Sequence, residues 1–208
     1  MIYIFDDRFE RRKIHSPQFI KNRDQITFSE FTPEGDLDKY IADFFGDAEI
    51  IILHYSYRFH NDNLTLEDIL KAFRNIPVIL FSGGFKNASV QEPDKRYRVN
   101  SIVMYDNLPV FLKQRQKDKY TPIEILLFGK KFVINQFMKL LYELNQSYFD
   151  KTNLKIDSDE IIDLIEDILS YSGLENERHH LIHIVERNKE TLTYPELVKL
   201  IENIMHEL

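Results

Sequence analysis

Short apolar segments alternate with segments of helical period along the first 120 residues. The apolar segments are rich in β-branched and aromatic residues and hold few polar positions, a composition typical of strands buried on both faces of a parallel sheet. Five segments have this composition: IYIF (2–5), ITF (26–28), EIIIL (49–53), PVILF (77–81) and SIVMY (101–105). We therefore predict five buried strands.

Between these segments the apolar residues recur at the spacing of an amphipathic helix. Residues 37–46, 65–73 and 107–116 each present one apolar face. Residues 84–100 show no helical period and contain Pro93, which predicts a loop or a poorly formed helix. Strands that alternate with helices predict an α/β fold with a five-stranded, doubly wound parallel sheet and right-handed crossovers.

The pattern changes at QKDKYTP (116–122), a charged segment that ends in proline and is typical of a linker. Beyond it helical spacing dominates, and one long helix is expected over 123–144, with Gly129 as the point where it could bend. Further amphipathic segments follow at 157–173, 175–188 and 193–208. We predict an α/β domain over residues 1–118 and a small all-α helical bundle over 122–208.

Composition narrows the functional classes. The 208 residues include no cysteine, which excludes disulfides and thiolate chemistry, and no apolar run near the roughly 20 residues of a membrane span. The net charge is −7; residues 1–120 balance 18 Lys and Arg against 18 Asp and Glu, so the excess lies in residues 121–208. An acidic helical half does not attract nucleic acid or anionic lipid. We expect a cytoplasmic protein that binds neither membranes nor nucleic acid.

Polar side chains stand at the ends of four predicted strands. Asp6 and Asp7 follow the first strand, His54 the third and Ser82 the fourth, and Tyr105 ends the fifth. The carboxyl ends of parallel strands meet at one edge of a sheet, where the ligands of doubly wound folds bind. We therefore expect these five side chains to share one crevice.

This layout resembles the receiver domains of two-component response regulators, a flavodoxin-like family, over about the first 118 residues. The resemblance implies an acidic pair that binds Mg²⁺ after the first strand, a phosphoacceptor aspartate after the third, a hydroxyl residue after the fourth and a lysine after the fifth. Asp6 and Asp7 match the acidic pair, and Ser82 matches the hydroxyl residue. His54 stands in place of the phosphoacceptor, and Tyr105 in place of the lysine. The resemblance implies a pseudo-receiver, in which the fold is kept and the phosphorylation chemistry is lost.

An imidazole cannot form an aspartyl phosphate, so we predict a non-enzymatic signalling or adaptor protein that acts through contacts with a protein partner or with a second copy of itself. No cofactor is expected other than Mg²⁺, for which Asp6 and Asp7 are the candidate ligands. The alternative is a flavodoxin-like enzyme, or a small-ligand or metal-binding protein, that uses Asp6, Asp7 and His54. A regulator of a neighbouring bacterial kinase or defence system is a third hypothesis.

Positive charge is concentrated in the segment expected to be a loop. It comes from Lys86, Lys95, Arg96 and Arg98. By resemblance to receivers, this segment is a candidate partner surface, and a solvated loop is the plainer alternative.

Three histidines lie close together in the predicted bundle. His179, His180 and His183 follow Glu177, and Glu177 with His180 forms the E-x-x-H half of a carboxylate di-iron site. A second E-x-x-H is absent from the sequence, so we expect surface histidines and no metal site.

Overall fold

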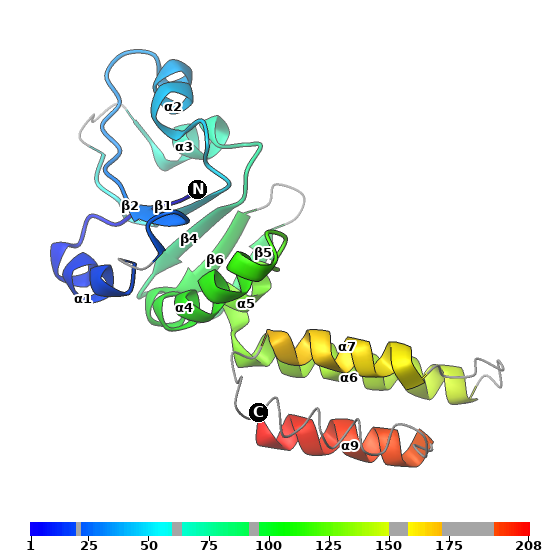
Figure 1. Cartoon of the computed structure of the whole chain (residues 1–208). Helices are drawn as coiled ribbons and strands as arrows, with labels where there is room; N and C mark the ends of the chain where they lie inside the picture. The colour runs from blue at the N-terminus through cyan, green and yellow to red at the C-terminus, as the bar shows by residue number, and fades with distance from the viewer. Residues whose placement is uncertain (20–21, 60–63, 92–95, 150–157, 172–193) are drawn as a thin grey trace. The chain divides into compact units, whose positions relative to one another are not determined.

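A computed structural model describes residues 1–19, 22–59, 64–91, 96–149, 158–171 and 194–208 (Figure 1). The chain divides into two compact units, residues 1–112 and 113–208. The division lies within helix α4 (Ser101–Lys117), a few residues before the segment expected to be a linker.

The first unit is an α/β fold built on one six-stranded sheet. The strands are β1 (Ile2–Phe5), β2 (Ile26–Phe28), β3 (Ile50–His54), β4 (Val78–Ser82), β5 (Ser89–Gln91) and β6 (Arg96–Asn100). Their order across the sheet is β2-β1-β3-β4-β6-β5, and every pair is parallel except β5 with β6. Four predicted strands are confirmed to within one residue, because each is a short apolar run that the sheet buries.

The fifth predicted strand is wrong, and the sheet is neither five-stranded nor wholly parallel. SIVMY forms the start of α4, and its apolar positions continue at helical spacing through buried Met104, Leu108 and Phe111. The strand that pairs with β4 is RYRVN, within the segment expected to be a loop. It alternates between apolar and charged positions: Tyr97 and Val99 are buried on one face, while arginines occupy the other. A search for continuous apolar runs misses such a strand.

Helices cover both faces of the sheet. The helices α1 (Phe9–Phe19) and α4 lie on one face, and α2 (Leu37–Phe45) and α3 (Leu66–Ala72) lie on the other (Figure 1). Side chains alternate between the faces along each strand, so Phe5 packs in a core cluster with residues of α2 and α3 while Ile4 points to the opposite face.

An aromatic cluster fixes the loops beside the carboxyl ends of β2 and β3. Phe31, only 1% exposed, follows β2, and its ring packs against those of Phe5, Tyr40, Phe45, Phe59 and Phe73. Its backbone N–H donates a hydrogen bond to the Tyr57 hydroxyl at 3.1 Å. The loop that carries Tyr57 is thereby tied to the loop that follows β2.

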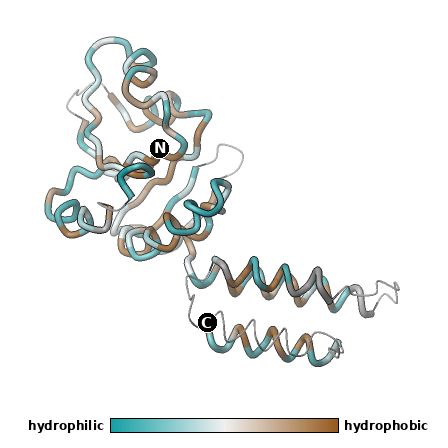
Figure 2. The backbone as a smooth tube through the Cα atoms, viewed as in Figure 1, coloured by the Kyte–Doolittle hydropathy of each residue, from teal (hydrophilic) through white to brown (hydrophobic). Residues whose placement is uncertain are grey.

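The second unit is helical. It contains α5 (Glu124–Phe128), α6 (Lys130–Phe149), α7 (Ser158–Ser170) and α9 (Tyr194–Glu207), along which hydrophobic and hydrophilic positions alternate (Figure 2). The apolar faces of α6, α7 and α9 share one core, which includes Phe137, Ile165 and Ile201, each fully buried. The helix expected over 175–188, with His179, His180 and His183, lies outside the described residues.

The long helix expected over 123–144 is interrupted at Gly129, which separates α5 from α6. Gly129 has φ +53° and ψ −130°, a backbone conformation that residues with a Cβ rarely adopt. No described helix is both long enough and apolar enough to span a bilayer.

Substituting Gly129→Ala is expected to destabilise the helical unit by about 1–3 kcal/mol, because a Cβ is strained in this conformation. Thermal unfolding of the full chain, followed by circular dichroism, measures the loss. Lys131→Ala, at an exposed position in the first turn of α6, is the matched control and should leave the melting temperature nearly unchanged. Equal melting temperatures for the two variants would contradict a strained junction.

Candidate functional site

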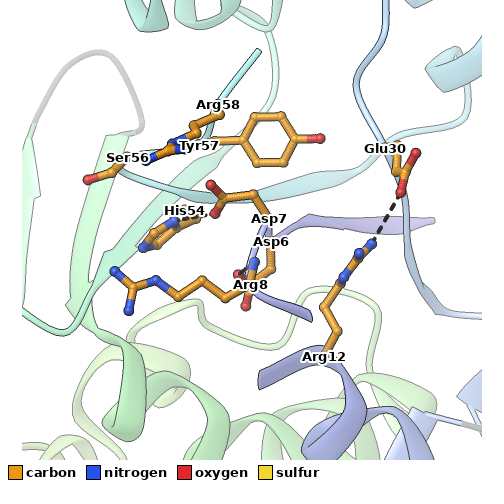
Figure 3. A pocket seen from close by; sticks show the side chains of 9 residues that line it. All are labelled: Asp6, Asp7, Arg8, Arg12, Glu30, His54, Ser56, Tyr57 and Arg58. Carbon is orange, nitrogen blue, oxygen red and sulfur yellow. Dashed lines mark hydrogen bonds and ion pairs between the residues drawn. The ribbon is translucent and has the colours of Figure 1, made fainter. Parts of the chain in front are cut away.

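A pocket of about 580 Å³ lies beside the carboxyl ends of β1 and β3. Charged and polar side chains dominate its lining, which consists of Asp6, Asp7, Arg8, Arg12, Glu30, His54, Ser56, Tyr57 and Arg58 (Figure 3). The residues come from the ends of two neighbouring strands, the start of α1 and the loops tied together by Phe31. The sheet topology therefore brings together segments far apart in the sequence.

Asp6 follows β1 directly, and its carboxylate is 1% exposed. Arg11, one turn into α1, holds both oxygens: Nε donates to Oδ2 at 2.6 Å and Nη2 donates to Oδ1 at 2.7 Å. The backbone N–H of Arg8 donates to Oδ1 at 3.0 Å, and the Tyr105 hydroxyl donates to Oδ2 at 2.9 Å. Each carboxylate oxygen therefore accepts two hydrogen bonds.

These contacts decide the charge of Asp6. Burial alone would raise the pKa of the carboxyl group. This effect is outweighed by the hydrogen bonds from Arg11, the Arg8 N–H and Tyr105, together with the positive charge of Arg11. The pKa of Asp6 is therefore held below its usual value. Burial lowers the pKa of Arg11, and the contact with Asp6 reverses this effect and raises it. Both groups are therefore ionised at neutral pH.

Tyr105 extends these contacts to α4. Its side chain is buried, and this burial is the largest cause of a raised phenol pKa; the charge of Asp6 and the hydrogen bond to Asp6 raise that pKa further. The phenol therefore stays protonated and is the hydrogen-bond donor to Asp6. The His15 ring stacks on the Tyr105 ring with centroids 3.9 Å apart, and the Arg11 guanidinium lies over the Phe81 ring at 5.1 Å. Residues of β1, α1, β4 and α4 are thus linked around one buried carboxylate.

His54 and Asp7 form a second pair. His54 ends β3 with a side chain 3% exposed, and its Nδ1 lies 2.8 Å from Oδ1 of Asp7, which is 24% exposed and faces the pocket (Figure 3). One ligand atom from each of Asp6, Asp7 and His54 lies within 4.8 Å of the others, a separation that suits a divalent metal. Arg11 already occupies both Asp6 oxygens, so a metal would have to displace a guanidinium group.

The other sequence-predicted site residues lie differently. Tyr105 contacts Asp6 from a helix, not from the end of a strand. Ser82 ends β4 but does not line the pocket; its Oγ accepts a hydrogen bond from the Gly84 N–H at 3.2 Å, within the turn that follows the strand.

Two of the basic residues of the candidate partner surface contact other side chains. Arg96 lies 3.9 Å from the Glu67 carboxylate, and the Arg98 guanidinium lies over the Phe85 ring at 5.9 Å. Lys86 is exposed, and Lys95 lies outside the described residues.

Sequence reasoning missed the arginines of this site. Arg8, Arg11 and Arg12 follow the acidic pair within the segment DDRFERR, and Arg58 follows the third strand. A run of basic residues directly after a strand and its acidic pair indicates that one of them could form an ion pair with the acidic pair. An inspection limited to the residues at the strand ends does not consider these basic residues.

No protein-family model matches the chain, and no curated protein matches it either.

Replacing Asp6 with Asn is expected to lower the free energy of unfolding at pH 7 by about 3 kcal/mol, because Arg11 is left largely buried without its counter-ion. Since folding lowers the pKa of Asp6, its contribution is complete above the unfolded pKa of about 4 and is lost as the pH falls through the lower folded value. Urea unfolding from pH 7 to pH 2.5 should show the wild type and Asp6→Asn converging in acid.

The matched control is Asp43→Asn, an exposed carboxylate on α2, which should change stability little at any pH. A difference between the wild type and Asp6→Asn that stays constant down to pH 2.5 would argue against an ion-paired Asp6.

Proposed function

We propose that the α/β unit is a flavodoxin-like, receiver-like module that does not use phosphorylation, and that the protein is a non-enzymatic signalling or adaptor protein. The strand order supports this proposal: without β5, the sequence β2-β1-β3-β4-β6 corresponds to the 2-1-3-4-5 order of flavodoxin-like sheets. β5 is then an added antiparallel strand at the edge.

The single observation that carries the proposal is the Arg11 fork on Asp6. Phosphorylation of a receiver needs a divalent cation on the acidic pair and a carboxylate nucleophile beside it. Arg11 provides the positive charge at Asp6 from within the chain, at 2.6 and 2.7 Å. His54 provides an imidazole, bonded to Asp7, where the nucleophile would stand. The site therefore has an arginine on Asp6 and an imidazole beside Asp7, neither of which performs the chemistry of a phosphoacceptor carboxylate.

Protein–protein contact is the proposed mode of action. The Tyr105 hydrogen bond connects Asp6 to α4, so the side-chain network around the pocket is linked directly to this helix. A protein partner, or a second copy of the chain, that binds one arrangement of this helix better than another would shift the population of the two. No phosphoryl group is required for such a shift.

The clustering of Asp6, Asp7 and His54 supports a second candidate function, a metal-dependent enzyme or a metal-binding protein. Two carboxylates with one imidazole form a ligand set for Mn²⁺ or Zn²⁺ more than for Mg²⁺, which prefers oxygen ligands and water. The Arg11 contact weighs against this function, because it both neutralises Asp6 and repels a second cation.

Titration of the full chain with Mg²⁺ and beryllofluoride is expected to give no heat of binding, and incubation with Mg²⁺ and acetyl phosphate is expected to leave the intact mass unchanged. The physical reason is that His54 cannot accept a phosphoryl group as a carboxylate does. A chain carrying one added phosphoryl group that survives as an acyl phosphate would overturn the proposal.

Arg11→Ala is expected to raise the affinity for Mn²⁺ by at least about tenfold, since it removes one hydrogen bond from each Asp6 oxygen and a positive charge in direct contact with Asp6. Arg12→Ala, which removes an arginine 3.5 Å from Glu30, is the matched control and should have a much smaller effect. Calorimetry with Mn²⁺ measures both. Tight Mn²⁺ binding by the wild type, unchanged in Arg11→Ala, would favour the second candidate function.

A further inference from the structure

Two of the three carboxylates in the pocket lining have an arginine partner, and two of the lining arginines form no ion pair with any described residue. Asp6 is held by Arg11, Asp7 by His54, and the Glu30 carboxylate lies 3.5 Å from Arg12. Each carboxylate of the lining therefore already has a partner. The remaining charged side chains of the lining belong to Arg8 and Arg58.

Arg8 and Arg58 are both exposed, and neither guanidinium forms an ion pair with any of the residues that the structure describes. Figure 3 shows the Arg8 side chain running past Asp6 on one side of His54, with Arg58 on the other side. Arg8, which directly precedes α1, and Arg58, in the loop after β3, thus border the pocket. The lining holds three arginines and three carboxylates, and Arg11 behind Asp6 adds a fourth positive charge, although the whole chain has a net charge of −7.

We propose that this pocket binds a small molecule that carries a diphosphate or phosphate group. Guanidinium groups present paired N–H donors that match phosphate oxygens, and two of them favour an anion with more than one charge. The volume of about 580 Å³ lies within the range of pockets that enclose a small ligand, and is larger than inorganic phosphate needs. The ligand is therefore a phosphorylated organic molecule.

Neutral donors complete the site. Ser56 and Tyr57 both line the pocket, and each carries a hydroxyl group. Tyr57 is held in place by the Phe31 N–H, which donates to its oxygen at 3.1 Å. A ligand with phosphate oxygens at the arginines would meet these hydroxyl groups with its remaining polar atoms. The assignment does not depend on the receiver-like proposal, since it uses only the lining and its charges.

Asp7 distinguishes this proposal from a cation site. Its carboxylate faces the pocket and would repel an anion but attract a metal ion (Figure 3). Removing its charge therefore has opposite effects on the two kinds of ligand.

The test is calorimetry of the full chain with sodium pyrophosphate, at constant ionic strength and without divalent metal. The wild type is expected to bind with a dissociation constant below about 1 mM. Arg8→Ala and Arg58→Ala should each weaken binding about tenfold, because each removes charge-assisted hydrogen bonds. Arg74→Ala, at an exposed position outside the pocket, is the matched control and should bind as the wild type does.

Asp7→Asn is expected to bind pyrophosphate several-fold more tightly than the wild type. No binding by the wild type, equal weakening by Arg74→Ala, or loss of binding in Asp7→Asn would each overturn the proposal. Circular dichroism spectra that match the wild type show that the variants are folded, so a weaker affinity reports on the pocket.

Discussion

The burial of the Asp6 carboxylate is the constraint on which the arrangement of the α/β unit depends. An ionised carboxylate that is 1% exposed is stable only when its oxygens are fully hydrogen-bonded and its charge is balanced. Arg11 from α1, the Arg8 N–H and Tyr105 from α4 meet both conditions. One charge thereby fixes the end of a central strand and two helices on the same face of the sheet. Loss of any one of these partners would leave a buried polar or charged group without its hydrogen bond, which destabilises the fold.

The same contact determines what the neighbouring pocket can do. Because the charge of Asp6 is balanced from within, it contributes little to the binding of an external cation. Asp7 is engaged differently, through its 2.8 Å contact with the His54 imidazole. What remains to face solvent is a lining in which arginine is the commonest charged residue. The pocket stands at the carboxyl ends of β1 and β3, and the arginines of its lining that form no ion pair with a described residue are Arg8 and Arg58.

The sequence predicts the position of this site better than its contents. Asp6, Asp7 and His54 follow buried apolar runs, so parallel strand ends suffice to place them together. Tyr105 is expected at the end of a strand and instead contacts Asp6 from α4, because an apolar run of five residues is equally compatible with one face of a helix. Arg11 escapes prediction, since its contact with Asp6 depends on where α1 begins and on which turn faces the strand. β6 escapes because its arginines interrupt the apolar pattern.

The two outermost strands have a consequence for how this protein can associate. β2 and β5 are each three residues long, and β5 runs antiparallel against β6, where the parallel sheet would otherwise end in a five-residue strand. Short edge strands offer few unpaired backbone groups, which disfavours edge-to-edge pairing between the sheets of two molecules. Side chains on the helices and loops, whose shape and charge set specificity, are then better suited to association than the sheet edges, and uncontrolled polymerisation is disfavoured.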